Sequence, residues 1–267
     1  MHKTYSLAGF FAVASMAFIS STMTSCGSKA DGKEKTDSTS TAAAYTISPE
    51  LQSLIAKIRQ FQEWPYKVDT TLLKIEDKVM EDSLSSADVK MLSVNWLKHD
   101  LTDEVEVELS DYYKIDSVHR AGAYKEYCEA LEPGNTQTSV AYPLASLNVD
   151  KDTWVLVWAL RASSFPACPH FSLNNAYGSV IYKGEVTQSF KMGENMSAGD
   201  PPSHMDRFVT SSINEKGLLT LDVVENSTYD GEEMSTVNEH YEFQLVNGKL
   251  KMKKEEKKKP VTSKIPQ

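Results

Sequence analysis

The sequence predicts an α+β fold in which a mainly helical part precedes an antiparallel β part. In the first half, apolar residues recur at helical spacing, whereas the second half consists of short apolar runs typical of strands. Hairpin turn signals separate those runs, which favours an antiparallel sheet, sandwich or small barrel. The chain has 267 residues, enough for one large domain or two small ones with a real core.

Residues 1–25 have the order of a secretory signal peptide. A short basic start at His2 and Lys3 leads into an uncharged apolar stretch from Leu7 to Ser25. A polar tract of small and charged residues follows from Gly27 to Ala42 and has no periodicity. We therefore expect residues 1–25 to be removed and residues 26–47 to form a flexible tether.

The four residues Met23-Thr24-Ser25-Cys26 resemble the lipobox of bacterial lipoproteins. The resemblance covers only the first tenth or so of the chain. It implies cleavage before Cys26, acylation of that cysteine, and anchoring to a membrane of the cell envelope, facing the periplasm or the exterior. The alternative is an ordinary secretory signal cut near Ser25, with Cys26 the first thiol of a soluble protein.

The predicted helical part covers residues 48–135. Ser48-Pro49-Glu50 combines an N-cap hydroxyl, a proline at the first helical position and an acid in the first turn. We expect this helix to run until Pro65. Its one apolar face consists of Leu51, Leu54, Ile55, Ile58 and Phe61. Weaker helical signals cover 72–80 and begin again at Ser86-Ala87-Asp88. The alternation of acids and apolar residues over 103–109 predicts a half-buried strand, with a helical turn as the alternative. The spacing over 116–131 predicts a helix.

The predicted β part covers residues 136–254. Trp154–Leu160 has the composition of a buried strand, with both of its tryptophans in the core. Further strands are expected over 177–182, 185–192, 207–213, 218–224, 237–246 and 249–253. Their turns are Lys183-Gly184, Asn214–Gly217 and Asn247-Gly248, of which the last is a strong hairpin signal.

Charge is distributed unevenly along the chain. Residues 26–248 hold 19 Lys and Arg against 35 Asp and Glu, whereas residues 249–267 hold eight Lys and two Glu. An acidic body argues against nucleic acid as a partner, because binding phosphate needs a basic face. We expect residues 255–267 to be a disordered basic tail, able at most to contact anionic lipid or glycan.

Once Cys26 is acylated, Cys128 and Cys168 are the remaining cysteines. In an oxidising compartment they could pair and close a loop of about 40 residues, worth about 3–4 kcal/mol. Two unpaired thiols are an equally good reading of the sequence.

Candidate site residues fall in the proline-rich segments between strands over 163–206. They are Cys168, His170, His204 and Asp206. Cys168 and His170 lack a second ligand pair for zinc, and Ser203, His204 and Asp206 are too close in sequence for a typical hydrolytic triad. The alternative is that the prolines only stiffen irregular connections between strands and that the histidines are ordinary loop residues without a functional role.

The sequence contains no Walker loop, dinucleotide fingerprint, nucleophile elbow or EF-hand loop, and it predicts no cofactor and no metal. We therefore expect a non-enzymatic module that binds a protein, peptide or glycan at the envelope. One alternative is an envelope hydrolase or metal-dependent enzyme using the 163–206 loops. The other is a structural envelope component.

Overall fold

The structure is a computed structural model that describes residues 45–73, 83–98, 105–164, 169–229, 231 and 233–264. The predicted signal peptide, Cys26, the tether up to residue 44 and Cys168 lie outside the described residues. Within the described part the chain is mainly β strand, and helices occur only between residues 49 and 130. The predicted mainly helical part over 48–135 is not supported, because short strands at 60–61 and 66–68 interrupt its helices. The helices are α1 (Pro49–Lys57), α2 (Ser86–Leu92), α3 (Val105–Arg120) and α4 (Tyr124–Ala130).

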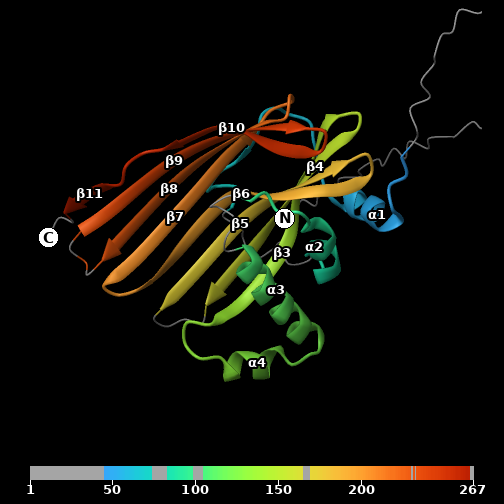
Figure 1. The fold of residues 1–267 in the computed structure, drawn as a ribbon. Coiled ribbons are helices and arrows are strands. Elements are labelled where there is room, and N and C mark those ends of the chain that lie inside the picture. Colours follow the sequence, from blue (N-terminus) through green and yellow to red (C-terminus); the bar gives the residue numbers. More distant parts are fainter. Residues whose placement is uncertain are drawn as a thin grey trace, which may run out of the picture. The chain divides into compact units, whose positions relative to one another are not determined.

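The strands form one mixed sheet with the order β1-β3-β4-β5-β6-β7-β8-β9-β10 (Figure 1). Strands β3 to β10 pair with their neighbours in antiparallel fashion, whereas β1 pairs with β3 in parallel. Short strands β2 and β11 add to β7 and β9. The bounds are β1 (Gln60–Phe61), β2 (Tyr66–Val68), β3 (Thr136–Asp150), β4 (Thr153–Ser164), β5 (His170–Tyr182), β6 (Glu185–Asp200), β7 (Ser203–Ile213), β8 (Leu218–Tyr229), β9 (Glu233–Val246), β10 (Lys249–Lys257) and β11 (Val261–Lys264).

Two apolar cores lie on opposite faces of the same strands. The strand-side core gathers side chains from β2 to β10, among them Leu147, Val157 and Phe243. The helix-side core packs α1, α2 and α3 against the sheet, with Leu156 and Trp158 among its members. Because side chains alternate along a strand, β4 supplies Val157 to one core and Leu156 to the other.

Turn chemistry sets the antiparallel pairing. Lys183 and Gly184 both have positive φ in the β5–β6 turn, and Asn247 and Gly248 do so in the β9–β10 turn. Two consecutive residues with positive φ define the tight hairpin whose twist matches that of the strands. The predicted turns at 183–184 and 247–248 are therefore confirmed. Trp158 is fully buried as predicted, whereas Trp154 is only half-buried against the helix-side core.

The predicted strand over 103–109 is wrong, because residues from Val105 onward belong to helix α3. Val105, Leu109, Tyr112 and Ile115 are buried at helical spacing, whereas Val107 is 65% exposed. The strand-like alternation is a coincidence over seven residues, and the longer window carries the helical period.

The predicted helix boundaries also need correction. Helix α1 ends at Lys57, well before Pro65, because residues 60–61 leave the helix to pair with β3. The helix expected over 116–131 is split, since Gly122 adopts a positive φ between α3 and α4. A glycine in that conformation commonly ends a helix. The residues beyond Arg120 then restart as α4.

Strands occupy most of the region where a disordered tail was expected. Strand β10 continues to Lys257, and residues 261–264 pair with 233–236 of β9 as β11. The pairing with a long neighbouring strand orders a lysine-rich segment that composition alone assigns to solvent. Among the described residues, no helix has the length and apolar character needed to cross a bilayer.

Candidate functional site

A pocket of about 570 Å³ lies between helix α3 and strands β3–β7. We call it the α3 pocket. Its walls are largely apolar. The apolar side chains come from helix α3, from four strands and from the residue that precedes β5: Val107, Ala162, Pro169, Phe171, Leu173, Met196, Ala198 and Met205. This volume falls in the range of sites that hold one small organic molecule.

The polar groups of the α3 pocket are concentrated on the helix. Glu108 and Asp111 lie one turn apart on α3, so both reach the pocket from the same side. Asp111 Oδ2 accepts a hydrogen bond of 3.0 Å from Thr136 Oγ1, another lining residue. His170 lies among the lining residues contributed by β5.

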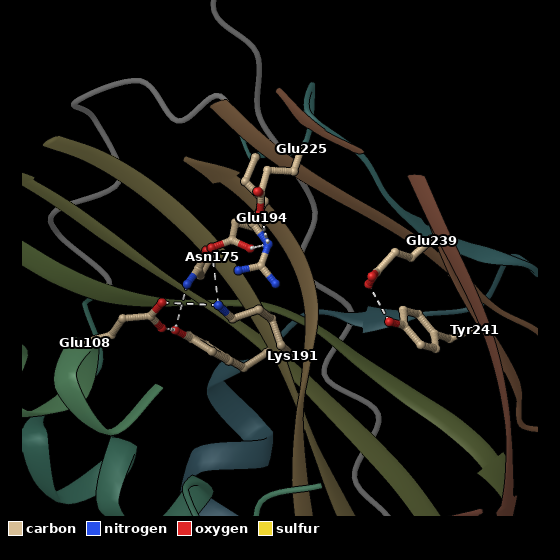
Figure 2. Close-up of polar contacts among 9 residues, drawn as sticks. Glu108, Asn175, Lys191, Glu194, Glu225, Glu239 and Tyr241 are labelled. Carbon is tan, nitrogen blue, oxygen red and sulfur yellow. Dashed lines mark hydrogen bonds and ion pairs between the residues drawn. The ribbon is translucent and has the colours of Figure 1, made fainter. Parts of the chain in front are cut away.

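A buried series of charges begins at Glu108 and continues through Lys191 to Glu194 (Figure 2). Lys191 Nζ lies 3.2 Å from Glu108 Oε1 and 3.3 Å from Glu194 Oε1. The Lys191 and Glu194 side chains are 1% and 0% exposed, so this pairing takes place out of solvent. It continues at the surface, where Arg207 Nε lies 3.5 Å from Glu194 Oε2 and 4.0 Å from Glu225 Oε2.

A β-bulge brings Lys191 and Glu194 onto one face of the sheet. Residues three apart in a regular strand point to opposite faces. The register between β5 and β6 shifts at this point, so that Lys191 lies opposite Tyr177 and Glu194 lies opposite Asn175. The extra residue in β6 therefore turns the charges toward α3.

Tyr177 links the helix to the sheet at the same point. Its hydroxyl donates a hydrogen bond to Glu108 Oε2 and accepts one of 3.0 Å from Asn175 Nδ2. Burial raises the pKa of Tyr177 well above its ordinary value, and the negative charge of Glu108 raises it further. The phenol therefore remains a neutral donor, and Glu108 is held in place by Tyr177 and Lys191 together.

Burial also raises the pKa of Glu194, although Lys191 and Arg207 act in the opposite direction. Within the described residues, Glu194 Oε2 and Arg207 Nε have no hydrogen-bond partner, so their contact is an ion pair without hydrogen-bond geometry. Buried ionisable groups with shifted pKa values are commonly found next to functional sites.

Three of the four predicted site residues come together at one end of the sheet. The rings of His170 and His204 stack with centroids 5.3 Å apart, and His204 Nε2 lies 3.0 Å from Asp206 Oδ1. Both histidines pair with Gly199, whose lack of a side chain allows the close approach: an added Cβ would lie 2.9 Å from His204 Cα. Only His170 lines the α3 pocket.

Only one of the two cysteines predicted to pair lies among the described residues. Cys128 is a half-buried free thiol on α4, and its predicted partner Cys168 lies outside the described residues. Within the described ranges, no group of three or more His, Cys, Asp or Glu side chains is arranged to hold a metal ion.

Sequence reasoning missed the buried charges of the α3 pocket. Glu108 was assigned to a strand, and Lys191 lay unremarked between Phe190 and Met192 in a predicted strand. A lysine flanked by two large apolar residues in a buried strand is itself a signal, because a buried ammonium needs a carboxylate partner. The bulge that supplies the partner has no comparable sequence signature.

Comparisons with protein families, with curated proteins and with solved structures found no match to this chain.

Proposed function

We propose that this protein is a lipid-anchored component of the bacterial cell envelope and that its β domain is a non-enzymatic binding module. The lipobox-like Met23–Cys26 segment supports the anchor, and its location would face the periplasm or the exterior. The acidic body and the missing catalytic motifs support a binding role.

The α3 pocket is the binding site in this proposal. The observation that carries it is a cavity of about 570 Å³ with largely apolar walls and two carboxylates, those of Glu108 and Asp111, on helix α3. That combination favours a small, largely apolar molecule over the protein, peptide or glycan suggested by the sequence, because macromolecular partners usually contact flatter and more polar surfaces.

Dye titration tests the site. The full chain should bind the neutral apolar dye Nile red with increased fluorescence. Ala198→Trp, which places an indole in the pocket, should abolish that increase. Asn195→Trp is the control, because Asn195 points to the other face of β6 and does not line the pocket. Equal binding by the two folded variants would contradict the site.

A separate experiment tests the anchor. Intact-mass analysis of the native protein should give a mature chain that begins at Cys26 and carries acyl groups. Cys26→Ser should release the protein from the membrane fraction with its fold unchanged by circular dichroism. An unmodified thiol at Cys26, or a variant that stays in the membrane, would overturn the anchor and leave the pocket untouched.

The envelope hydrolase is a second candidate because His170, His204 and Asp206 lie together beside the pocket. In a hydrolase, His204 oriented by Asp206 would act as a base. Wild-type protein would then cleave aryl esters, and His204→Ala would lose that activity while keeping its dye affinity. The third alternative, a purely structural envelope component, predicts that the pocket does not bind dye.

A further inference from the structure

We infer that the ligand of the α3 pocket is an organic cation, with an apolar body in the pocket and a protonated amine at Glu108 and Asp111. This inference rests on the proposed function, whose binding site it adopts. It goes further in assigning the charge of the ligand and the two residues that select it.

The lining residues have an excess of negative charge. Glu108 and Asp111 are the carboxylates among them, and none of the described lining residues is Lys or Arg. A cation that enters a pocket with apolar walls loses water, so it must gain charged partners there. The α3 pocket offers two carboxylates to a cation, whereas His170 is the one basic side chain among its described lining residues.

Asp111 is the more available of the two carboxylates. It is half-buried, and its described hydrogen bond is the one from Thr136 Oγ1 to Oδ2. A carboxylate offers about four acceptor positions on its two oxygens. Asp111 can therefore accept hydrogen bonds from an ammonium group without giving up Thr136.

Glu108 is the more rigid carboxylate. Each of its oxygens accepts one hydrogen bond, from Lys191 and from Tyr177, which leaves acceptor capacity on the pocket side. Lys191 is shared between Glu108 and the buried Glu194, and Arg207 also pairs with Glu194. Preorganised in this way, Glu108 would bind a donor at little entropic cost.

The walls fit a ligand body of variable shape. Met196 and Met205 line the pocket opposite the helix, and unbranched thioether side chains adjust to irregular apolar surfaces. An alkyl or aryl amine would place its apolar part against these methionines and Leu173, with its ammonium group at α3.

Competition among three ligands of equal chain length tests the charge. Decylamine, decanol and decanoate would each be titrated, below their micelle concentrations and at neutral pH, against Nile red bound to the full chain. We expect decylamine to bind about 10-fold more tightly than decanol, as charge-assisted hydrogen bonds allow. Decanoate should bind most weakly, because its carboxylate meets two others.

Two variants of equal charge assign the effect to the pocket. Asp111→Asn should weaken decylamine binding about 10-fold and leave decanol binding unchanged. Glu106→Gln removes the same charge from an exposed position of α3 and should change neither affinity.

The outcomes separate the two proposals. If the dye binds but decylamine and decanol compete equally, the cation inference is overturned and the binding pocket stands. If both variants weaken decylamine equally, the preference reflects general charge and the assigned residues are wrong. If no dye binds, both the proposed binding site and the inferred cationic ligand are contradicted.

Discussion

Lys191 is a buried lysine whose charge is compensated by two carboxylates. It is 2% exposed within β6 and lies between two carboxylates on the helix side of the sheet. A buried ion pair gives little net stability compared with an apolar replacement of both partners, but the loss of one partner leaves a buried charge uncompensated. The same arrangement that holds Glu108 at the pocket therefore makes the fold sensitive at Lys191.

Replacement of Lys191 by methionine should reveal this sensitivity. Lys191→Met keeps the length of the side chain but leaves Glu108 and Glu194 without their shared cation. We expect the free energy of unfolding in urea to fall by about 3–5 kcal/mol. Lys254→Met removes the lysine of an exposed pair with Glu256 and should change stability little. Equal effects at the two positions would show that the buried pairs do not differ from surface pairs.

Glu194 should give the stability of the protein a recognisable pH dependence. Burial raises the pKa of Glu194, so the folded chain keeps this proton at a pH where the unfolded chain releases it. The contribution of Glu194 to the free energy of unfolding is therefore largest below the unfolded pKa of about 4.3 and is lost as pH rises through the folded pKa.

Comparison with Glu194→Gln isolates this contribution, because other carboxylates titrate equally in both proteins. The difference in the free energy of unfolding, wild type minus variant, should decrease as pH rises above the unfolded pKa and become constant above the folded pKa. Urea titrations over a pH series measure it. A difference that grows with pH would mean that Lys191 and Arg207 outweigh burial at this carboxylate.

At the scale of elements, turns and bulges decide which side chains meet. The β9–β10 turn places Gly248 at a φ of +75°, and a Cβ added there would lie 2.5 Å from Tyr182 Cβ. Gly122, between α3 and α4, has the same φ of +75° but nothing within 4 Å of an added Cβ. Substitution of Gly122 would therefore measure the free-energy cost of the backbone conformation alone. Substitution of Gly248 would add the cost of a clash with Tyr182.

Alanine at each glycine should show this separation. Gly122→Ala should lower the free energy of unfolding by about 1–2 kcal/mol, the cost of a left-handed conformation with a side chain. Gly248→Ala should cost about 1–3 kcal/mol more, because Tyr182 must also move. Thermal or urea unfolding measures both. Equal losses would mean that the β9–β10 turn moves away from β5 at no cost.

Some of the helices and strands could be predicted from the sequence alone, and others could not. The Asn247-Gly248 turn and parts of the strands from residue 153 onward were predictable, because alternation and turn chemistry are local signals. Strands β5, β6, β7 and β9 extend beyond their predicted bounds, so His170, His204 and Asp206, which were expected in loops, lie within strands. Strand β3 was missed, although it is long, and α3 was partly assigned as a strand. Glu106 and Glu108 of α3 alternate with apolar residues as in a strand. Only the partners of Glu108 across the fold explain why Glu108 faces inward.

The site was predictable only in part for the same reason. His170, His204 and Asp206 were singled out by composition and do lie together. The pocket itself depends on the β6 bulge and on the docking of α3, which are long-range features. Lys191 and Glu194 lie on the same face only because of the register shift between β5 and β6, and no local sequence pattern specifies that shift.

At the scale of the whole described domain, the two cores share one set of strands. Leu147 on β3 belongs to the strand-side core and Leu156 on β4 to the helix-side core, and β3 and β4 pair along most of their length. Because strands β3, β4 and β5 contribute buried side chains to both cores, the loss of one core disrupts strands on which the other core depends. We therefore expect the helices and the sheet to unfold together.

Leucine truncations in each core test this coupling. Leu147→Ala and Leu156→Ala remove fully buried side chains, and each should lower the free energy of unfolding by about 2–5 kcal/mol. Tryptophan fluorescence reports chiefly on the helix-side core, where Trp158 is buried and Trp96 and Trp154 pack, whereas far-ultraviolet circular dichroism is dominated by the strands. Both signals should shift to the same urea midpoint in each variant. If Leu156→Ala moved the fluorescence transition ahead of the circular dichroism transition, the helices would be an independent layer. The α3 pocket would then open without loss of the sheet.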